Sequence, residues 1–274
     1  MPSFRNREGV ELWYEEQGQG RALVLLHGWG MSSAVWAQQM KRLSAGFRVI
    51  ALDMRGHGQS GSAPSGYDFE GFAADVVDLL AALEIRGACL LGWSMGAEVA
   101  IGAARSAEDR LAGLILVSGT PRFSAGDDFP HGLAPQESAG MAIKVRRNLG
   151  RALQGFTAGM FVPGELDDPT LAAETADMLA RVRYPEQTVA LASLKTLAES
   201  DLRGLLASIR LPTLVINGSA DMVCLPAASD YLATSIHNSS HVVLNGCGHA
   251  PFITRPDEFA ACIMDFCRRT LEFS

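Results

Sequence analysis

The pentapeptide Gly92-Trp93-Ser94-Met95-Gly96 decides the fold of this chain. It follows a short apolar run and precedes an alanine-rich run that can be helical. A serine flanked by glycines between a strand and a helix is typical of a tight turn that exposes a nucleophile. The glycines let the backbones approach closely, and the N-terminus of the helix favours negative charge at the serine. An ordinary glycine turn is the alternative reading, and the rest of the chain must discriminate between the two.

Composition restricts the class of protein. The chain has 274 residues, of which 48% are hydrophobic and 19% charged, so it can bury a large core. Its formal net charge of -7 argues against a nucleic-acid partner. The five cysteines form no C-x-x-C pair, which indicates reduced thiols. With no signal peptide and no membrane-spanning run in the sequence, we expect a cytoplasmic protein without a membrane partner.

Short apolar runs ending in turn residues alternate with helical patterns along much of the chain. Continuous apolar runs are typical of parallel strands that are covered on both faces. The alternation predicts an α/β fold with a mostly parallel, doubly wound sheet. The expected strands are 22–26, 49–52, 88–91, 114–117, 213–217 and 241–244.

The alternation stops near residue 120 and resumes near residue 211. The segment between contains no strand pattern, and 123–140 is rich in glycine and proline. We therefore expect an α/β core formed by 1–120 and 211–274, with an inserted α-helical cap at 121–210. The cap is expected on the side of the sheet where the strand ends carry the chemistry. Its helical stretches are predicted at 141–161, 169–182 and 186–198.

A serine nucleophile needs a base and an orienting carboxylate. Asp221 follows the expected strand 213–217, and His249 follows the expected strand 241–244. Both would lie at the same sheet edge as Ser94, and the order Ser, Asp, His is that of hydrolases with this kind of turn. Other acidic residues and histidines have a weaker context, namely Asp53, Asp230, His131, His237 and His241. We predict a catalytic triad of Ser94, Asp221 and His249.

An acyl-transfer site also needs hydrogen-bond donors for the oxyanion. His27-Gly28-Trp29-Gly30 follows the first expected strand and matches the H-G-x-G loop that supplies one backbone N–H. We assign that donor to Trp29 and the second to Met95. The sequence contains no zinc spacing, no H-E-x-x-H, no P-loop and no Rossmann context, so no metal and no cofactor is expected.

Three motifs together resemble the BioH family of the α/β-hydrolase superfamily. They are 25–31 (LLHGWGM), 92–96 (GWSMG) and 248–253 (GHAPFI), with further similarity at 194–203. BioH proteins are pimeloyl-[acyl-carrier protein] methyl ester esterases, and the resemblance implies that Ser94 attacks such an ester through an acyl-enzyme in biotin synthesis. It also implies a set of substrate contacts at Trp29, Trp93, Phe156, Thr157, Ala158, Gly159, Met160 and Val223.

A basic segment of the expected cap suits an acidic partner. No acidic residue occurs in 138–164, and the i, i+3, i+7 spacing of Lys144, Arg147 and Arg151 places them on one helical face. We expect these three residues to contact acyl-carrier protein, with a solvated basic face as the alternative. The segment 165–168 that follows is acidic.

Other functions of the same triad stay open. A general short-chain carboxylesterase, a C–C bond hydrolase and a cofactor-free haloperoxidase-like enzyme would all use Ser94, Asp221 and His249. A ligand receptor of the same fold with an intact triad is the alternative outside catalysis.

Overall fold

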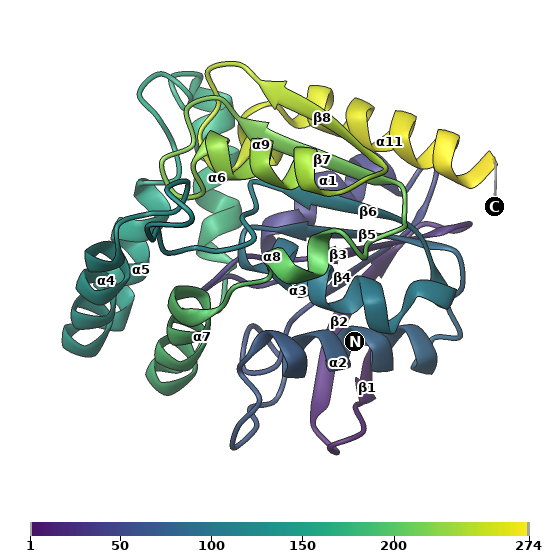
Figure 1. Ribbon diagram of the computed structural model, residues 1–274, viewed down its shortest axis with the longest axis horizontal. Coiled ribbons are helices and arrows are strands. Elements are labelled where there is room, and N and C mark those ends of the chain that lie inside the picture. The colour runs from purple at the N-terminus through teal and green to yellow at the C-terminus, as the bar shows by residue number, and fades with distance from the viewer. Residues whose placement is uncertain (1, 273–274) are drawn as a thin grey trace.

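The computed structural model describes residues 2–272, in which one sheet has the strand order β1-β2-β4-β3-β5-β6-β7-β8 (Figure 1). Strands β3 to β8 run parallel, whereas β1 and β2 are antiparallel to their neighbours. The predicted mostly parallel sheet is confirmed, and every expected strand is present. The bounds are β1 Ser3–Arg5, β2 Glu11–Gln17, β3 Ala22–Leu26, β4 Arg48–Leu52, β5 Ala88–Trp93, β6 Leu111–Val117, β7 Thr213–Gly218 and β8 Ser239–Leu244.

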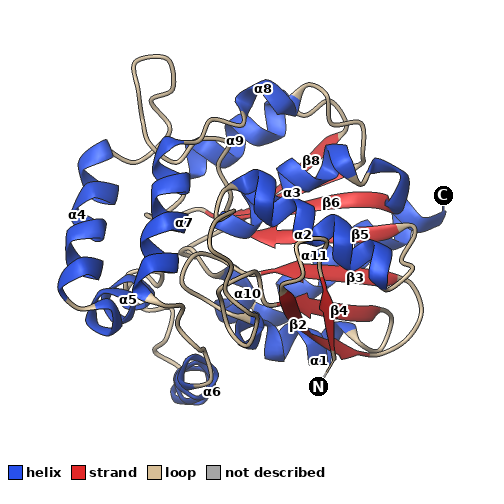
Figure 2. Ribbon diagram, turned by 90° about the horizontal axis from the view of Figure 1, so that it is seen from below, coloured by secondary structure: helices blue, strands red, loops and turns tan. Residues whose placement is uncertain are grey.

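Helices cover both faces of the sheet (Figure 2). Alternate side chains of β3 point to opposite faces: Val24 and Leu26 join the apolar cluster under α2 and α3, and Leu23 and Leu25 join the cluster under α1 and α11. This alternation explains why the strands read as continuous apolar runs. The helices of the α/β layers are α1 Ala37–Leu43, α2 Phe69–Ala82, α3 Met95–Ser106, α8 Arg203–Leu206, α9 Pro226–Ser235, α10 Pro251–Thr254 and α11 Pro256–Glu272.

Of the five helices between β6 and β7 in the chain, the four that precede α8 sit together at one end of the sheet in both views (Figures 1 and 2). These cap helices are α4 Pro135–Arg147, α5 Leu149–Ala158, α6 Pro169–Ala180 and α7 Gln187–Glu199. The single helix expected at 141–161 is wrong. Asn148 adopts extended φ/ψ values of -163° and 100°, and its side chain accepts a hydrogen bond from the Arg151 N–H, so it ends α4 and caps α5.

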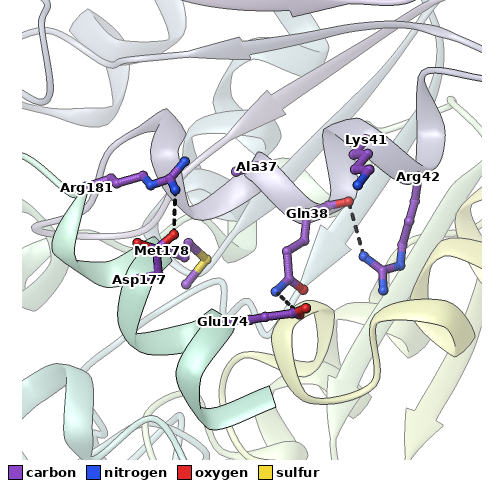
Figure 3. Close-up of a pocket in the computed structure, with 8 residues that line it drawn as sticks. All are labelled: Ala37, Gln38, Lys41, Arg42, Glu174, Asp177, Met178 and Arg181. Atoms are coloured by element: carbon purple, nitrogen blue, oxygen red, sulfur yellow. Dashed lines mark hydrogen bonds and ion pairs between the residues drawn. The ribbon is translucent and has the colours of Figure 1, made fainter. Parts of the chain in front are cut away.

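The cap helices pack onto the core of the sheet. Val145 of α4, Leu153 of α5 and Ala190 of α7 are buried in the same apolar cluster as β3 and α2. At the surface, the Gln38 side chain on α1 also donates a hydrogen bond to Glu174 on α6 at 3.0 Å, beside a pocket between the two helices (Figure 3). Burial of apolar cap side chains against the core of the sheet thus fixes the position of the cap.

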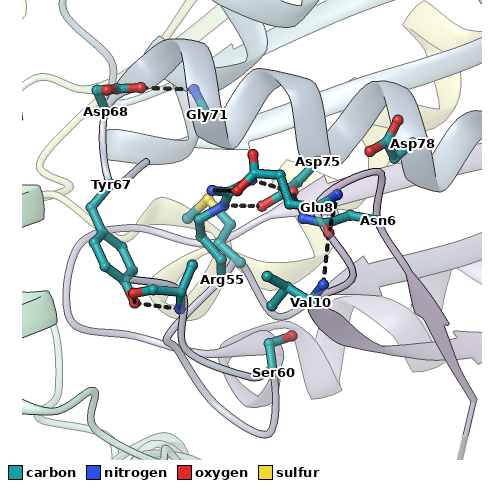
Figure 4. Close-up of polar contacts among 12 residues, drawn as sticks. Asn6, Glu8, Val10, Arg55, Ser60, Tyr67, Asp68, Gly71, Asp75 and Asp78 are labelled. Carbon is teal, nitrogen blue, oxygen red and sulfur yellow. Dashed lines mark hydrogen bonds and ion pairs between the residues drawn. The ribbon is translucent and has the colours of Figure 1, made fainter. Parts of the chain in front are cut away.

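A buried ion-pair network ties the N-terminal hairpin to the core (Figure 4). Arg55 is completely buried and donates to both carboxylate oxygens of Asp75, at 2.6 and 2.7 Å. It also donates to Glu8 at 3.1 Å, while Asn6 donates to Asp75 at 2.6 Å. Paired, bidentate geometry is what makes a buried guanidinium tolerable. Arg55 therefore has a structural role.

Candidate active site

Ser94 occupies a strained turn between β5 and α3. Its φ of 55° and ψ of -124° lie where few residues other than glycine are found. A side chain at Gly92 would collide with the backbone of Gly96, and one at Gly96 would lie 2.5 Å from the carbonyl oxygen of Leu26. Both glycines are needed because the backbones of β5, α3 and β3 meet here. Ser94 is consequently held at the carboxyl end of the sheet's central strands.

The Asp221 carboxylate is fully engaged by hydrogen bonds. It follows β7, and its Oδ1 accepts from the backbone N–H groups of Val223 at 2.8 Å and Cys224 at 3.0 Å. Its Oδ2 lies 2.8 Å from Nδ1 of His249. Asp221 and His249 are 1% and 0% exposed, so this pair is shielded from water. Ser94, Asp221 and His249 therefore all follow the carboxyl ends of parallel strands, at one edge of the sheet.

His249 has one ring nitrogen in use and one free. Its Nε2 has no hydrogen-bond partner among the described residues. Its backbone is held from two sides: the N–H donates to Met160 at 2.8 Å, and the carbonyl accepts from the indole N–H of Trp93 at 2.8 Å. Trp93, predicted to contact substrate, is itself 1% exposed and packs its ring 5.4 Å from the His249 ring.

Two backbone N–H groups beside Ser94 are available as donors. Within the described part of the chain, neither the Trp29 N–H nor the Met95 N–H makes a hydrogen bond. The loop carrying Trp29 approaches the turn closely, since a Cβ at Gly28 would lie 3.2 Å from the Ser94 Cβ. The Trp29 indole is anchored to the cap, donating to the Ala190 carbonyl at 2.9 Å. Free backbone donors next to the nucleophile are what an oxyanion site requires.

The other predicted contacts lie in the cap, except Val223, which lies in the loop after β7. Phe156 is half-buried and meets the Trp29 ring edge-on at a centroid distance of 5.1 Å. Thr157, Met160 and Val223 are buried, whereas Ala158 and Gly159 are exposed. The three basic residues are exposed and share one groove, although Arg151 is on α5 and the other two are on α4. This groove is lined by Met141, Lys144, Arg147, Asn148, Arg151, Ala152, Gly155 and Phe156.

The acidic rivals of Asp221 have other roles. Asp53 accepts hydrogen bonds from the Ser33 N–H at 2.6 Å and the Gln59 N–H at 2.8 Å, and so holds a turn. Asp230 forms an ion-pair contact with His241 at 3.4 Å on the surface of α9 and β8. These hydrogen bonds and this ion pair do not involve Ser94, Asp221 or His249.

Two buried residues near Ser94 were missed by the sequence reasoning. The backbone N–H of Cys224 donates to Asp221 at 3.0 Å, and burial raises the pKa of the Cys224 thiol well above its usual value. Glu98 is 1% exposed, neither of its carboxyl oxygens has a partner among the described residues, and burial strongly raises its pKa. No sequence pattern distinguishes either residue, because burial of a cysteine or a glutamate depends on the tertiary packing.

Other kinds of site find little support in residues 2–272. No group of three or more His, Cys, Asp or Glu side chains in this range could hold a metal ion. Within the same range, no helix has the length and apolar character needed to cross a membrane.

The fold and the gathered residues place the chain in a known class: residues 21–256 match the alpha/beta hydrolase fold family. Pimeloyl-[acyl-carrier protein] methyl ester esterases from Nitrosospira multiformis and Nitrosomonas europaea are each 32% identical to it. These alignments cover 94% and 90% of this chain, and 99% and 96% of the relatives. The chain therefore belongs to the BioH family of α/β-hydrolases and is a carboxylic ester hydrolase.

Solved structures agree with this class. An esterase from Exiguobacterium antarcticum superposes with a TM-score of 0.90 at 25% identity, covering 97% of this chain and 98% of that one. A bromoperoxidase from Bacillus anthracis gives a TM-score of 0.88 at 27% identity, covering 97% of this chain and 100% of that one. One fold thus accommodates proteins named for different chemistries.

Proposed function

We propose that this protein is a serine esterase that hydrolyses the methyl ester of pimeloyl-[acyl-carrier protein]. The observation that carries the proposal is the buried Asp221–His249 pair, 2.8 Å apart, whose free Nε2 lies at the same sheet edge as Ser94. The names of the relatives from Nitrosospira and Nitrosomonas support the substrate. We also propose that residues 121–210 act as the cap that covers the acyl chain.

In the proposed reaction, the Ser94 hydroxyl attacks the ester carbonyl while Nε2 of His249 takes its proton. The N–H groups of Trp29 and Met95 stabilise the oxyanion. Methanol leaves with the proton from His249, and a water molecule activated by the same nitrogen then hydrolyses the acyl-enzyme. Asp221 holds the imidazole in the required tautomer and stabilises its protonated form.

Docking of the carrier is proposed at the basic groove between α4 and α5. Lys144, Arg147 and Arg151 are exposed there, and the groove reaches Phe156, whose ring contacts Trp29. A carrier protein and its phosphopantetheine arm are anionic, so complementary charge would speed the encounter. The apolar end of the groove would then receive the acyl chain.

A general short-chain carboxylesterase is the second candidate. The similarity to the esterase from Exiguobacterium antarcticum supports it. The same triad would act, and the basic groove would be an ordinary solvated surface.

Hydrolysis of methyl pimeloyl-[acyl-carrier protein] by the purified chain separates the two candidates. We expect kcat/KM for the carrier-bound ester to exceed that for free methyl pimelate, and we expect Ser94→Ala to lose activity on both. The charge variant Arg147→Glu should lower kcat/KM only for the carrier-bound ester. Equal rates on the two esters, unchanged by Arg147→Glu, would favour the general esterase; an active Ser94→Ala would refute both.

A further inference from the structure

A short segment of the cap lies directly on the loop that carries His249. We name residues 160–165, between α5 and α6, the strut. Its first residue, Met160, accepts a hydrogen bond from the His249 N–H at 2.8 Å. Its last residue, Glu165, is 7% exposed, and its Oε1 accepts from the Gly248 N–H at 3.0 Å and the Thr254 hydroxyl at 2.7 Å. The strut therefore holds the backbone of His249 and residues that precede and follow it in the sequence.

The fit between strut and loop is tight. A Cβ at position 248 would lie 2.9 Å from Oε2 of Glu165 and closer still to the Met160 carbonyl, so only glycine is accommodated there. Oε2 of Glu165 meanwhile accepts from the Val162 N–H at 2.8 Å. A buried carboxylate with three donors is well satisfied, and hydrogen bonds to an ionised acceptor are stronger than neutral ones.

We propose that Glu165 is a positioning residue for His249, coupling the cap to the catalytic loop. The inference rests on the proposed catalytic role of His249. A catalytic imidazole must be held within about 0.5 Å of its productive position, and hydrogen bonds from residues behind it provide that precision. Asp221 fixes the ring, whereas Glu165 and Met160 fix the backbone that carries it. Glu165 thus faces inward and adds no acidic charge to the surface that a carrier would meet.

Only a carboxylate suits this position. A glutamine at 165 has one oxygen acceptor, and its NH2 group would face a donor, either the Val162 N–H or the pair from Gly248 and Thr254. Glu165→Gln therefore keeps the volume of the side chain but loses at least one hydrogen bond and leaves two donors opposed. The loop would then sample positions in which Nε2 of His249 is displaced from Ser94.

Asp168 provides a matched control. It lies three positions on, in the same acidic run, and also accepts from two backbone N–H groups, those of Thr170 at 2.9 Å and Leu171 at 2.8 Å. Asp168 is exposed and caps α6, and its hydrogen bonds among the described residues go to Thr170 and Leu171, not to the His249 loop. Asp168→Asn thus perturbs the same part of the cap while leaving the strut's hydrogen bonds in place.

The test compares Glu165→Gln, Asp168→Asn and Thr254→Val in the full chain with p-nitrophenyl acetate, an ester too small to need the cap groove. Thr254→Val removes one donor to Glu165 and serves if Glu165→Gln does not fold. We expect Glu165→Gln to lower kcat by about 10- to 100-fold with KM within about twofold, as for other supporting residues behind a site. Thr254→Val should lower kcat less, and Asp168→Asn should stay within about twofold of the parent chain.

Two outcomes would overturn the positioning role. One is a kcat for Glu165→Gln and Thr254→Val equal to that of Asp168→Asn; the other is a loss fully explained by the unfolded fraction in a melting curve at the assay temperature. His249→Ala keeps the two proposals separate. If His249→Ala stays active, the proposed triad fails; if it is inactive while Glu165→Gln and Thr254→Val match Asp168→Asn, only the role of Glu165 fails.

Discussion

His27 and His249 both follow parallel strands and are both 0% exposed, yet their hydrogen bonding differs completely. Nδ1 of His27 is 2.8 Å from the Gly28 carbonyl, and its Nε2 accepts from the Met54 N–H at 3.1 Å, so neither nitrogen is free. In His249 the Asp221 carboxylate lies at Nδ1, and Nε2 has no partner among the described residues. Burial and a free ring nitrogen do not by themselves mark a catalytic histidine, because Nε2 of the buried His57 also lacks a partner there while its Nδ1 faces the Arg55 carbonyl. What distinguishes His249 is a carboxylate at Nδ1 opposite a free Nε2.

The surroundings of His27 and His249 also differ in their charges. Burial lowers the pKa of His27 to about 4, and no carboxylate compensates. His57, whose ring centroid is 5.2 Å from that of His27, has a pKa lowered to about 3 by burial and by the neighbouring His27. Both rings are therefore neutral at pH 7 and act as structural hydrogen-bonding groups. His249 instead has the Asp221 carboxylate 2.8 Å from its Nδ1.

The largest expected effect is on catalysis. His249→Gln should lower kcat/KM for a small ester by about 10⁴-fold or more, because the proposed base is removed. The midpoint temperature of thermal unfolding, Tm, should change by only a few degrees. A steady-state assay with a melting curve on the same sample checks this, and less than a tenfold loss would remove the catalytic distinction between the two histidines.

For His27→Leu we expect the opposite: a large loss of stability and a small loss of activity. The leucine leaves the Gly28 carbonyl and the Met54 N–H without partners, which should cost about 2–3 kcal/mol of unfolding free energy. The kcat per folded molecule should fall far less than in His249→Gln. Urea unfolding measures the first quantity; a stability equal to that of the parent chain would show that the two hydrogen bonds contribute nothing.

The buried, neutral His27 should also make the free energy of unfolding depend on pH. The folded pKa of His27, about 4, lies below the unfolded value of about 6.5, so between these values only the unfolded chain takes up the proton. Stability is therefore lost as the pH falls, by about 2 kcal/mol from His27 on going from pH 7 to pH 5. His27→Leu should lose that much less than the parent chain over this range, and parallel pH curves for the two chains would contradict the assignment.

A smaller gain is expected in α3, one turn after Ser94. Glu98 is buried and neither of its carboxyl oxygens has a partner among the described residues, so Glu98→Leu should stabilise the fold by about 1–2 kcal/mol. The folded pKa of Glu98 is raised, so its stability contribution is present at low pH and lost as the pH rises above the unfolded value. The gain of Glu98→Leu should accordingly grow from pH 4 to pH 8, whereas Glu98→Gln, still unpartnered, should gain less. Chemical unfolding at several pH values tests this, and a destabilised Glu98→Leu would indicate a hidden partner.

Local patterns predicted most of the architecture. Apolar runs bounded by turn residues predicted the six parallel strands, because a strand covered on both faces is apolar throughout. The edge strand β8 is the exception, since its first three residues are polar and only its second half carries the pattern. The antiparallel β2 was not predicted: its residues 15–17 are polar, and it is held by pairing with the distant β4. The break at Asn148 was missed because a polar residue that caps a helix can equally continue one.

The sequence by itself determined that Ser94, Asp221, His249 and the loop at Trp29 lie at one edge of the sheet. Each follows a strand end, and parallel strands end at a common edge. Only the tertiary structure decided which groups surround them. The acidic character of 165–168 is visible in the sequence, but whether each carboxylate faces water or the interior is not. Glu165 faces the His249 loop because two of its three donors, Gly248 and Thr254, are 83 and 89 positions away in the sequence. Such contacts depend on how the cap packs against the sheet, which no local pattern encodes.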